Sequence, residues 1–432
     1  MINEPLLFIS LDGNDWSVKP YLGLSWIWQN AVQPETREIR YFMPARVPGS
    51  VLADMIRAGE VRDPFWNRQS LEAEWVPARQ WVFRKWFTLT KKQVVLQAEL
   101  VLMGLDYEAD IFLNGQPVGH HIGQFSHCRL PVGQYLVSGK NLLAIVLSEA
   151  PPEQPQLGRT SLTRTMKSRM TYGWDFCPRM IHVGIWDHVF LDLSGPARLC
   201  DIQISSQLSD DLREAVLTVD ATCRNADGAK LFVSIDKTKT FSDVTDNRAV
   251  CRLVLNDPKL WFPAGSGSQH RYRVCVDLMA QNGVLSDRRS IRHGIRRIEW
   301  QKNDPVRPSM ISDLNKTGIE PSFVLTVNGQ KTYIKGYNWV PIDAMYGESQ
   351  PERLNHLIAL AKQAGINLFR VWGGGLIEKD IFYEACAEAG IMIWQEFPFS
   401  SSGIDNKTPE DPDFLDFVRK EATAIVKQKR NH

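Results

Sequence analysis

The sequence lacks the features that mark nucleic-acid-binding and membrane proteins. Lys and Arg number 50 and Asp and Glu number 49, so the formal net charge is only +1. A chain without a charge excess does not attract nucleic acid or an anionic membrane surface. No apolar run approaches the roughly 18 residues of a membrane helix, and the N-terminus has no basic region typical of a signal peptide. We therefore expect a cytoplasmic protein with neither partner.

Paired cysteines and the common catalytic motifs are also missing. The seven cysteines are scattered, odd in number and without a C-x-x-C pair, which indicates reduced thiols rather than disulfides or a zinc ribbon. The chain has no His-Glu-x-x-His zinc motif and no Gly-x-Ser-x-Gly elbow. The glycine-rich segment RVWGGG (370–375) has the spacing of neither a P-loop nor a dinucleotide site. We expect no metal and no cofactor.

Tryptophan, in contrast, is abundant, with 14 residues in a chain of 432. Such a surplus is typical of a carbohydrate site, because sugar rings stack on indole, but large β-sandwich cores also contain many tryptophans. The length predicts two to four domains, since an ordinary domain has about 100–150 residues.

Most of the first 300 residues alternate between apolar and polar side chains in short runs, which is typical of antiparallel strands. Asn114-Gly115 is a strong two-residue hairpin signal. We expect a jelly-roll sandwich over residues 1–195 and an immunoglobulin-like sandwich over residues 196–300.

The remaining residues, 301–432, have a different pattern. A polar connection (301–321) precedes a hairpin turning at Asn328-Gly329, and three strand-like segments then alternate with two helical ones. Both helical segments end in Gly, and a further helix is expected from Pro412. The pattern predicts βαβαβ, the first part of a (β/α)8 TIM barrel. The strand segments are 333–343, 366–375 and 391–399, and the helical segments are 351–365 and 378–390.

The carboxyl ends of these parallel strands meet at one face, and they carry Trp, Asn, Arg and Glu. Indoles to stack on and polar groups to bond hydroxyls suggest a sugar site. Arg370 is best explained as an ion-pair partner of a nearby carboxylate. Glu378 is best explained as a favourable charge in the first turn of the helix that follows it.

The loop GWDF (173–176) has two interpretations. Trp174 and Asp175 could stack on a ring and accept hydroxyl hydrogen bonds, or Trp174 could pack between sheets while Asp175 caps a turn. Spacing alone favours the packing interpretation. Glycoside hydrolysis needs two facing carboxylates, and no pair stands out among Asp343, Glu378 and Glu396.

Several long segments resemble family 2 of the glycoside hydrolases, within it the β-mannosidase branch. They are ARVPGSVLADMIRAGEVRDPFW (45–66), WVPARQWVFRKWF (75–87), YGWDFCPR with GIWDHVFL (172–191), GYNWVPID (336–343) and NLFRVWGGGLIEKDIFYEACAEAGIMIWQEFPF (367–399). The resemblance implies a jelly-roll domain, an immunoglobulin-like domain and a (β/α)8 barrel. The implied reaction is retaining removal of a terminal, non-reducing β-D-mannose through two carboxylates.

The resemblance also assigns residues to the sugar site. Trp174 and Asp175 match the family's Gly-Trp-Asp loop, and Trp372 matches the Trp of its Arg-Val-Trp-Gly-Gly-Gly strand end. Asn338 and Trp339 match its first-strand motif, and Glu396 occupies a position that is usually acidic. Where the family usually has Trp and Gly after Gly-Trp-Asp, this chain has Phe176 and Cys177.

The family's acid/base and nucleophile glutamates are expected beyond His432, so no catalytic residue is assigned within this sequence. We expect the chain to be the N-terminal portion of a longer protein and to be inactive alone, because three strands do not close a barrel. Exo-β-glucosaminidase, β-galactosidase or β-glucuronidase relatives share this architecture. A non-catalytic carbohydrate-binding module is the remaining alternative. Nothing in the sequence indicates an oligomeric state.

Overall fold

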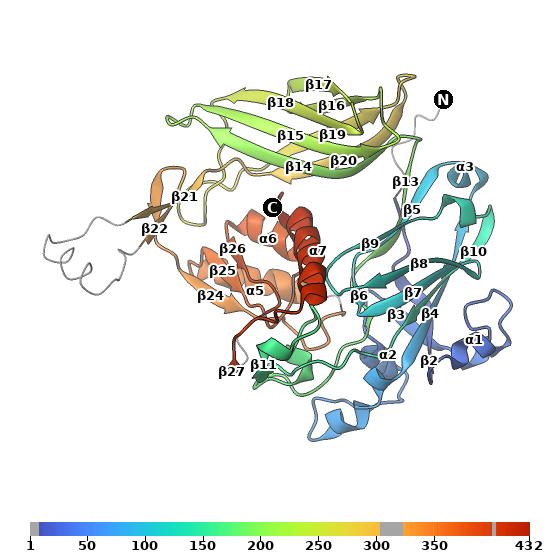
Figure 1. Cartoon of the computed structure of the whole chain (residues 1–432). Coiled ribbons are helices and arrows are strands. Elements are labelled where there is room, and N and C mark those ends of the chain that lie inside the picture. Colours follow the sequence, from blue (N-terminus) through green and yellow to red (C-terminus); the bar gives the residue numbers. More distant parts are fainter. Residues whose placement is uncertain (1–7, 303–322, 349, 400–402) are drawn as a thin grey trace, which may run out of the picture.

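The computed structural model describes residues 8–302, 323–348, 350–399 and 403–432. Two β-sandwiches and a segment of alternating strands and helices make up this part of the chain (Figure 1). The first sandwich passes into the second where β13 (Val189–Ser194) is followed by β14 (Arg198–Leu208). The predicted fold class is confirmed for both sandwiches and for the βα units. The division of the chain at residues 195 and 300 remains a prediction.

The first sandwich consists of two antiparallel sheets. One sheet has four strands in the order β1 (Phe8–Ser10), β13, β5 (Gln97–Leu102) and β9 (Cys128–Pro131). The other has six strands in the order β3 (Met43–Val47), β2 (Gly13–Tyr21), β4 (Gln80–Leu89), β10 (Gly139–Leu147), β7 (Glu108–Leu113) and β8 (Gln116–Ile122).

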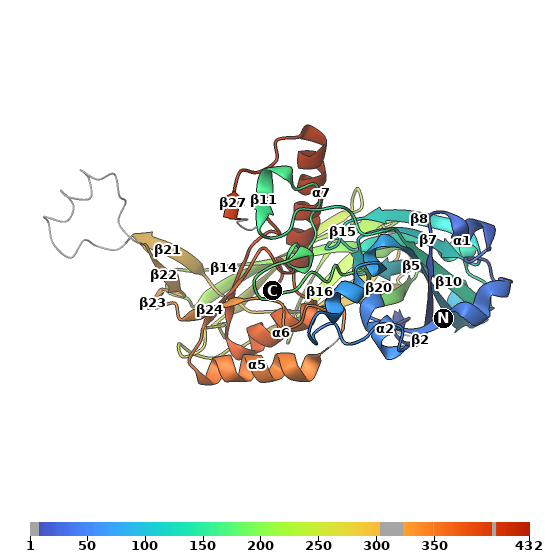
Figure 2. The ribbon, with the colours of Figure 1, turned by 90° about the horizontal axis from the view of Figure 1, so that it is seen from below.

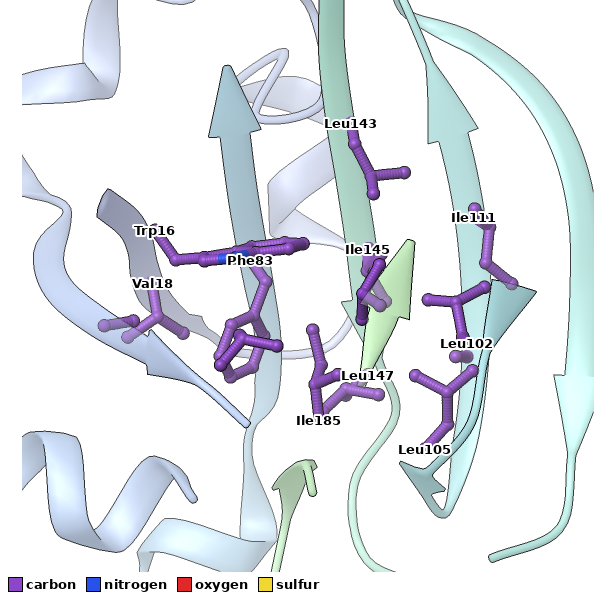
Figure 3. Packing of buried hydrophobic residues seen from close by; sticks show 14 of the residues in the cluster. Trp16, Val18, Phe83, Leu102, Leu105, Ile111, Leu143, Ile145, Leu147 and Ile185 are labelled. Atoms are coloured by element: carbon purple, nitrogen blue, oxygen red, sulfur yellow. The ribbon is translucent and has the colours of Figure 1, made fainter. Parts of the chain in front are cut away.

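Side chains from both sheets meet in one apolar core (Figure 3). Trp16 and Phe83 lie edge to face with ring centroids 6.5 Å apart, and both are at most 2% exposed. A second apolar layer around Trp26 covers the outer side of the six-stranded sheet, so the central strand β10 is buried on both faces. Burial of this apolar area, worth about 25 cal/mol per Å², is the main stabilising contribution.

The predicted hairpin at Asn114-Gly115 is confirmed. β7 pairs antiparallel with β8, and the two turn residues have φ of 52° and 79°. Positive φ at both central positions matches the twist of the flanking strands, and Asn and Gly tolerate it best. The Asn114 side chain also accepts from the Leu142 amide at 2.8 Å, which joins the turn to the neighbouring strand.

The second sandwich packs a three-stranded sheet on a four-stranded one. Its strands alternate between buried and exposed residues, as an antiparallel sheet with one solvated face requires. The first sheet is β14, β15 (Glu214–Arg224) and β18 (Arg248–Asn256), and the second is β17 (Thr238–Asp243), β16 (Lys230–Ile235), β19 (Tyr272–Met279) and β20 (Leu285–His293).

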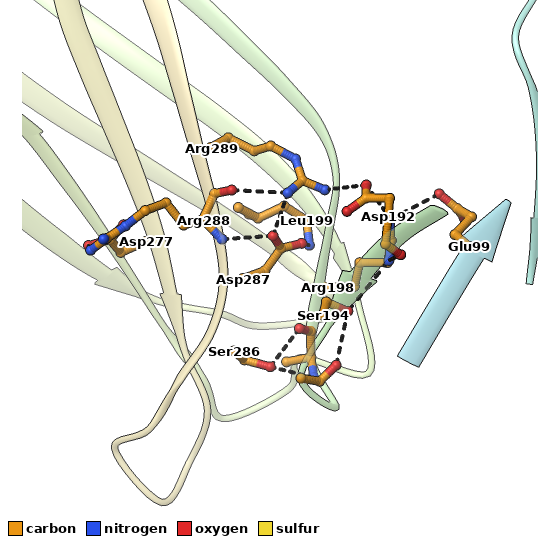
Figure 4. Close-up of polar contacts among 12 residues, drawn as sticks. Glu99, Asp192, Ser194, Arg198, Leu199, Asp277, Ser286, Asp287, Arg288 and Arg289 are labelled. Carbon is orange, nitrogen blue, oxygen red and sulfur yellow. Dashed lines mark hydrogen bonds and ion pairs between the residues drawn. The ribbon is translucent and has the colours of Figure 1, made fainter. Parts of the chain in front are cut away.

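Ion pairs and backbone bonds join the two sandwiches at their boundary (Figure 4). Arg198 lies 3.2 Å from Glu99 and also pairs with Asp192. Arg289 bonds Asp192 and Asp287, each at 2.7 Å. The carboxylates of the first sandwich are therefore neutralised by arginines of the second.

A three-stranded antiparallel sheet connects the second sandwich to the last segment. Its strands are β21 (Ile298–Lys302), β22 (Phe323–Val327) and β23 (Gln330–Thr332), and the predicted turn at Asn328-Gly329 is present. Nearly all of the connection predicted at 301–321 lies outside the described residues.

The predicted βαβαβ segment is present. Strands β24 (Gly336–Trp339), β25 (Leu368–Val371) and β26 (Met392–Gln395) form a parallel sheet in that order. Helices α5 (Pro351–Gln363) and α6 (Asp380–Ala389) are the crossover connections. They cover one face of the sheet, where Phe369 and Phe382 are each 1% exposed.

Local sequence signals set the helix ends. Pro351 occupies the first turn of α5, and Gly390 ends α6 with φ of 77°, a left-handed conformation that Gly adopts at low cost. Helix α7 (Pro412–Lys429) begins where Asp411 accepts from the Phe414 amide at 2.9 Å. α7 stands upright beside the first sandwich in Figure 2.

Short elements complete the described part of the chain. Two small sheets pair β6 (Leu105–Asp106) with β12 (Gly184–Ile185), and β11 (Gly158–Arg159) with β27 (Gly403–Asp405). The short helices are α1 (Ser25–Trp28), α2 (Val51–Arg57) and α3 (Lys91–Val94), with 3-10 turns at η1 (Arg37–Tyr41), η2 (Gln69–Ala73), η3 (Val76–Ala78), η4 (Gly133–Tyr135), η5 (Thr160–Leu162) and η6 (Met170–Tyr172). Among the described residues, no helix has the length and apolar character to span a membrane.

Candidate functional site

The parallel sheet has one apolar face and one polar face. Asn338, Arg370 and Trp394 are register partners on β24, β25 and β26, so they lie side by side on the face away from α5 and α6. Asn338 and Trp394 are exposed, and Arg370 is half-buried. Three side chains with hydrogen-bonding or stacking capacity thus share one surface at the carboxyl ends of the strands.

Arg370 is the centre of a hydrogen-bond cluster on this face. Its Nε donates to Glu396 Oε1 at 2.7 Å, and one terminal nitrogen donates to Asn338 Oδ1 at 3.1 Å. The Gly373 amide donates to the other oxygen of Glu396 at 2.9 Å. The prediction that Arg370 pairs with a nearby carboxylate is confirmed. Both oxygens of Glu396 are engaged, so its observed role is to fix the strand ends.

The three glycines after Trp372 allow close packing of the strand end. A Cβ at Gly373 would lie 2.3 Å from the Phe397 carbonyl oxygen, and one at Gly374 would lie 2.1 Å from the Trp372 ring. A Cβ at Gly375 would lie 2.6 Å from Pro341. Only glycine fits these positions without displacement of neighbours.

The loop carrying Trp174 is a short, hydrogen-bonded turn of the first sandwich. Backbone bonds join Trp174 and Cys177 in both directions, at 3.0 and 3.2 Å. Gly173 enters the turn with φ of 126°, a conformation that side chains rarely adopt. Asp175 and Phe176 lie at the tip and are both exposed. The turn therefore presents a carboxylate and an aromatic ring outward.

This turn meets the strand end of the parallel sheet. The rings of Trp174 and Trp372 are stacked, with centroids 6.0 Å apart and an interplanar angle of 30°. Phe176 contacts Trp372 edge-on at 5.9 Å. The packing interpretation expected Trp174 to lie between the sheets of the first sandwich. The ring instead stacks on Trp372 of the α/β segment. Aromatic rings from the first sandwich and from the parallel sheet form one cluster beside Asp175.

Hydrogen bonds hold the loop region and the α/β segment together. The Met170 amide donates to the Gly374 carbonyl of the α/β segment at 3.2 Å, and within the loop region the Gln156 amide donates to the Gly173 carbonyl at 3.2 Å. Further along, β11 pairs with β27, and the amide and hydroxyl of Ser161 bond Asp405 at 3.0 and 2.9 Å. The position of Trp174 against Trp372 is thus supported on both sides.

Trp339, predicted for the sugar site, lies elsewhere. It is 8% exposed and packs with Phe369 and Phe382 between the sheet and its helices. Successive residues of a strand point to opposite faces, so Trp339 faces the helices when its neighbour Asn338 faces the polar side. Its position corrects the prediction, because the ring has no exposed face for a sugar.

The role predicted for Glu378 is also corrected. α6 begins at Asp380, which supplies the acidic residue of its first turn, and Glu378 lies before the helix. Glu378 accepts from the Trp339 indole N–H at 2.9 Å. Burial raises the pKa of Glu378, against the opposing effects of this bond and the Lys379 charge.

The arrangement has the two kinds of group that recognition of a sugar ring requires. Aromatic rings supply an apolar surface, and Asp175 and Asn338 supply groups that bond hydroxyls. Among the described residues, no group of His, Cys, Asp or Glu side chains could hold a metal ion. The assignments of Trp174, Asp175, Trp372, Asn338 and Glu396 as sugar-binding residues remain predictions.

Two aromatic residues near the candidate site were not predicted. Phe176 was noted only as a departure from the family motif, and Trp394 was not singled out. The register of β26 with β25 places Trp394, which is 55% exposed, beside Arg370. The alternation of side chains along the third strand could have found it. Trp394 and Glu396 are two residues apart at the end of that strand, so both are expected on the same face.

Comparison with known proteins identifies the family. Residues 26–187 match the family model described as glycosyl hydrolase 2 galactose-binding domain-like, and residues 197–296 match the model of glycosyl hydrolases family 2. β-Mannosidase B of Thermothelomyces thermophilus is 28% identical over 95% of this chain and 48% of its own length.

Two solved structures resemble the whole chain. The β-D-mannosidase of Dictyoglomus thermophilum has a TM-score of 0.78 and 29% identity, covering 99% of this chain and 51% of that one. The exo-chitosanase of Amycolatopsis orientalis has a TM-score of 0.78 at 19% identity, covering 98% of this chain and 48% of that one, and so shows the fold alone. This chain spans about half the length of the curated relatives it matches. With matching models for both sandwiches and β-mannosidase relatives along nearly its whole length, the chain belongs to glycoside hydrolase family 2.

Proposed function

We propose that the whole protein is a retaining exo-β-mannosidase that removes terminal, non-reducing β-D-mannose. The observation that carries the proposal is the contact between Trp174 and Trp372, whose rings are 6.0 Å apart although they come from the first sandwich and the parallel sheet. The similarity to β-mannosidases of Thermothelomyces thermophilus and Dictyoglomus thermophilum supports the choice of sugar.

In this proposal the aromatic cluster forms one wall of the terminal sugar subsite. Asp175, exposed at the tip of its turn, accepts hydrogen bonds from ring hydroxyls, and Asn338 contributes from the first strand. Arg370 and Glu396 hold the strand ends in place through their ion pair. The family mechanism uses two carboxylates about 5–5.5 Å apart, and we assign neither to this sequence.

We further propose that the three-stranded parallel sheet is the beginning of a (β/α)8 barrel. Its helices cover one face, and the opposite face carries Asn338, Arg370 and Trp394. Polar and aromatic side chains at the carboxyl ends of parallel strands are typical of the catalytic face of such barrels.

The test is a panel of aryl β-glycosides given to the longest natural form of the protein and to residues 1–432 alone. We expect the natural protein to hydrolyse the β-mannoside faster than the β-glucoside, β-galactoside, β-glucuronide and β-glucosaminide, and the chain 1–432 to hydrolyse none. A preference for another glycoside would show that the proposed substrate, β-D-mannose, is wrong. Hydrolysis of any of these glycosides by a verified 1–432 preparation would contradict the proposal that the catalytic carboxylates lie outside this sequence.

A further inference from the structure

A buried carboxylate of the first sandwich, Asp106, accepts hydrogen bonds from three separate parts of the chain. Lys167 donates to one of its oxygens. His182 Nδ1 lies 2.8 Å from the other oxygen, and the Tyr346 hydroxyl donates to that same oxygen at 2.8 Å. Asp106 and Lys167 are 0% exposed, His182 is 3% and Tyr346 is 6%. The group is closed to solvent.

The three donors are placed around the candidate site in a specific way. Lys167 precedes Trp174 in the chain and His182 follows it, so both stems of the loop are attached to one carboxylate. Tyr346 comes from the connection between β24 and α5, in the α/β segment that carries Trp372. Asp106 therefore joins the two parts of the chain whose indoles stack.

Charge explains why the loop stems are held firmly. Burial alone would raise the pKa of Asp106, but the Lys167 charge and the His182 hydrogen bond outweigh it, and the pKa is lowered. Burial lowers the pKa of His182, so the ring is neutral and donates from Nδ1. Lys167 already neutralises the carboxylate, and it also donates to the His182 carbonyl at 2.9 Å. The hydrogen bond from the neutral Tyr346 hydroxyl therefore adds to a carboxylate whose charge Lys167 already balances.

The Tyr346 ring is fixed by further contacts. It stacks on His182 with centroids 4.0 Å apart, and Trp186 lies edge-on to it at 5.9 Å. Gln124 donates to the Tyr346 hydroxyl at 2.9 Å and accepts from the Ser168 amide at 2.7 Å. Ser168 and Met170 in turn contact the Gly374 carbonyl beside Trp372. An unbroken chain of bonded groups runs from Tyr346 to the strand end.

We propose that Tyr346 and Asp106 are positioning residues that set the placement of the Trp174 loop against Trp372 across the junction. Neither residue touches the sugar. The proposal rests on the proposed function for its catalytic meaning, but the placement of the two indoles can be measured without any sugar.

The test is the circular dichroism of the stacked indoles in chain 1–432. Stacked indoles couple their ultraviolet transitions and give a paired positive and negative band. Trp75 and Trp81 lie 6.1 Å apart and contribute a band of their own. The band of interest is therefore the difference between a protein and its Trp174→Phe counterpart. We expect Tyr346→Phe to lose most of this band at a temperature where the protein is fully folded.

The matched control is Tyr272→Phe in the second sandwich. Tyr272 is also buried, at 7% exposed, and its hydroxyl accepts from the Lys259 amide at 2.8 Å. It should keep the full band. A full band in Tyr346→Phe, or an equal loss in both variants, would overturn the proposal. If Tyr346→Phe does not fold, His182→Gln is used instead, because it removes the ring stacked on Tyr346, and an unchanged band there also overturns it.

A functional measurement separates this proposal from the proposed function. In the natural protein, Tyr346→Phe should lower kcat/KM on the β-mannoside on the order of tenfold, as expected for a misplaced binding group, while Tyr272→Phe leaves it unchanged. Loss of the band without any mannoside activity in the unmodified protein would refute the proposed function and leave the positioning role intact. If Tyr346→Phe loses the band but keeps its kcat/KM, the placement of the two indoles does not matter for catalysis.

Discussion

The ion pairs at the junctions of the two sandwiches with the α/β segment differ in how deeply they are enclosed. The first contributes a buried junction, where a fully enclosed ion pair, a tyrosine and aromatic rings interlock with the strand ends. The second contributes an outer junction, where Arg271 bonds Glu384 and Glu388, each at 2.8 Å, and Arg292 bonds Glu388 at 2.6 Å. Glu384 and Glu388 have side chains 38% and 57% exposed.

The buried junction positions the residues of the candidate site, whereas the outer junction only holds the helices behind it. Charges in a buried junction must be matched closely, because an unpaired charge without water is costly. At the outer junction the Arg271 side chain is 7% exposed, but its carboxylate partners are solvated whether or not they meet it, so each pair contributes little. The elements that place Trp174 beside Trp372 all belong to the first sandwich and its buried junction. The second sandwich keeps the helices oriented without contributing to the aromatic cluster.

The largest expected effect is at the buried junction. Lys167→Met leaves Asp106 enclosed without its cation, and should lower the free energy of unfolding by about 3–5 kcal/mol. Urea denaturation followed by near-ultraviolet circular dichroism measures this. The exposed Lys420→Met, whose side chain is 74% exposed, is the control. If both substitutions lower the free energy of unfolding equally and only slightly, water must reach Asp106 in the folded protein.

Acid should weaken the second sandwich from within its own core. Burial lowers the pKa of His293 from 6.5 to about 4. The unfolded chain therefore takes up a proton near pH 6.5 and the folded one only near pH 4, so the contribution is complete above pH 6.5 and is lost as the pH falls through this window. The change is about 3 kcal/mol at most.

The matching measurement is the urea midpoint of wild type and His293→Gln across that pH range. The wild-type midpoint should fall more steeply on acidification than that of the variant. His120→Gln, on the exposed surface of β8, is the control and should follow the wild type. Parallel profiles for wild type and His293→Gln would contradict the buried, neutral state of His293.

An intermediate effect is expected at the strand end. Gly374→Ala puts a Cβ 2.1 Å from the Trp372 ring, so the ring must move. Displacement of packed neighbours costs about 1–3 kcal/mol, and the stacked-indole band should change with it. Gly133→Ala, whose Cβ would meet only the Ala98 nitrogen at 3.8 Å and the Leu96 oxygen at 3.9 Å, separates the backbone cost of replacing a glycine from the clash. A folded Gly374→Ala protein with an unchanged band would show that Trp372 is not constrained there.

The smallest effect is expected at the outer junction. Arg271→Met makes the same change of cation to thioether as Lys167→Met, but it leaves only solvated carboxylates behind, so loss of the ion pairs should cost less than about 1 kcal/mol. The same urea experiment measures both substitutions. A loss at Arg271 as large as the loss at Lys167 would remove the distinction between the two junctions.

Local rules predicted the elements of the fold but not the buried junction. Hairpins at Asn114-Gly115 and Asn328-Gly329 and the helix ended by Gly390 follow from conformations that these residues prefer within a few positions. Asp106, Lys167 and Tyr346 have no such signature, because nothing local indicates which distant charges become enclosed together. Such pairings depend on the packing of domains, which is a tertiary property.

Strand parity explains the error in the candidate site. Asn338 and Trp339 are adjacent on β24, so only one of them can face the polar side. The segment resemblance matched both residues and did not assign faces. Spacing alone favoured packing of Trp174 between sheets, whereas the family resemblance assigned Trp174 and Trp372 to one site, and their rings are stacked in the structure.

Saturation-transfer NMR of chain 1–432 with methyl β-D-mannopyranoside tests most directly whether Trp174 and Trp372 form one sugar subsite. Saturation should reach the ring protons of the mannoside more strongly than those of the matching β-glucoside. Trp174→Ala and Trp372→Ala should each abolish it, and the double variant should add nothing further. Ring-proton saturation that persists in both single variants, or none in the unmodified chain, would contradict a shared subsite.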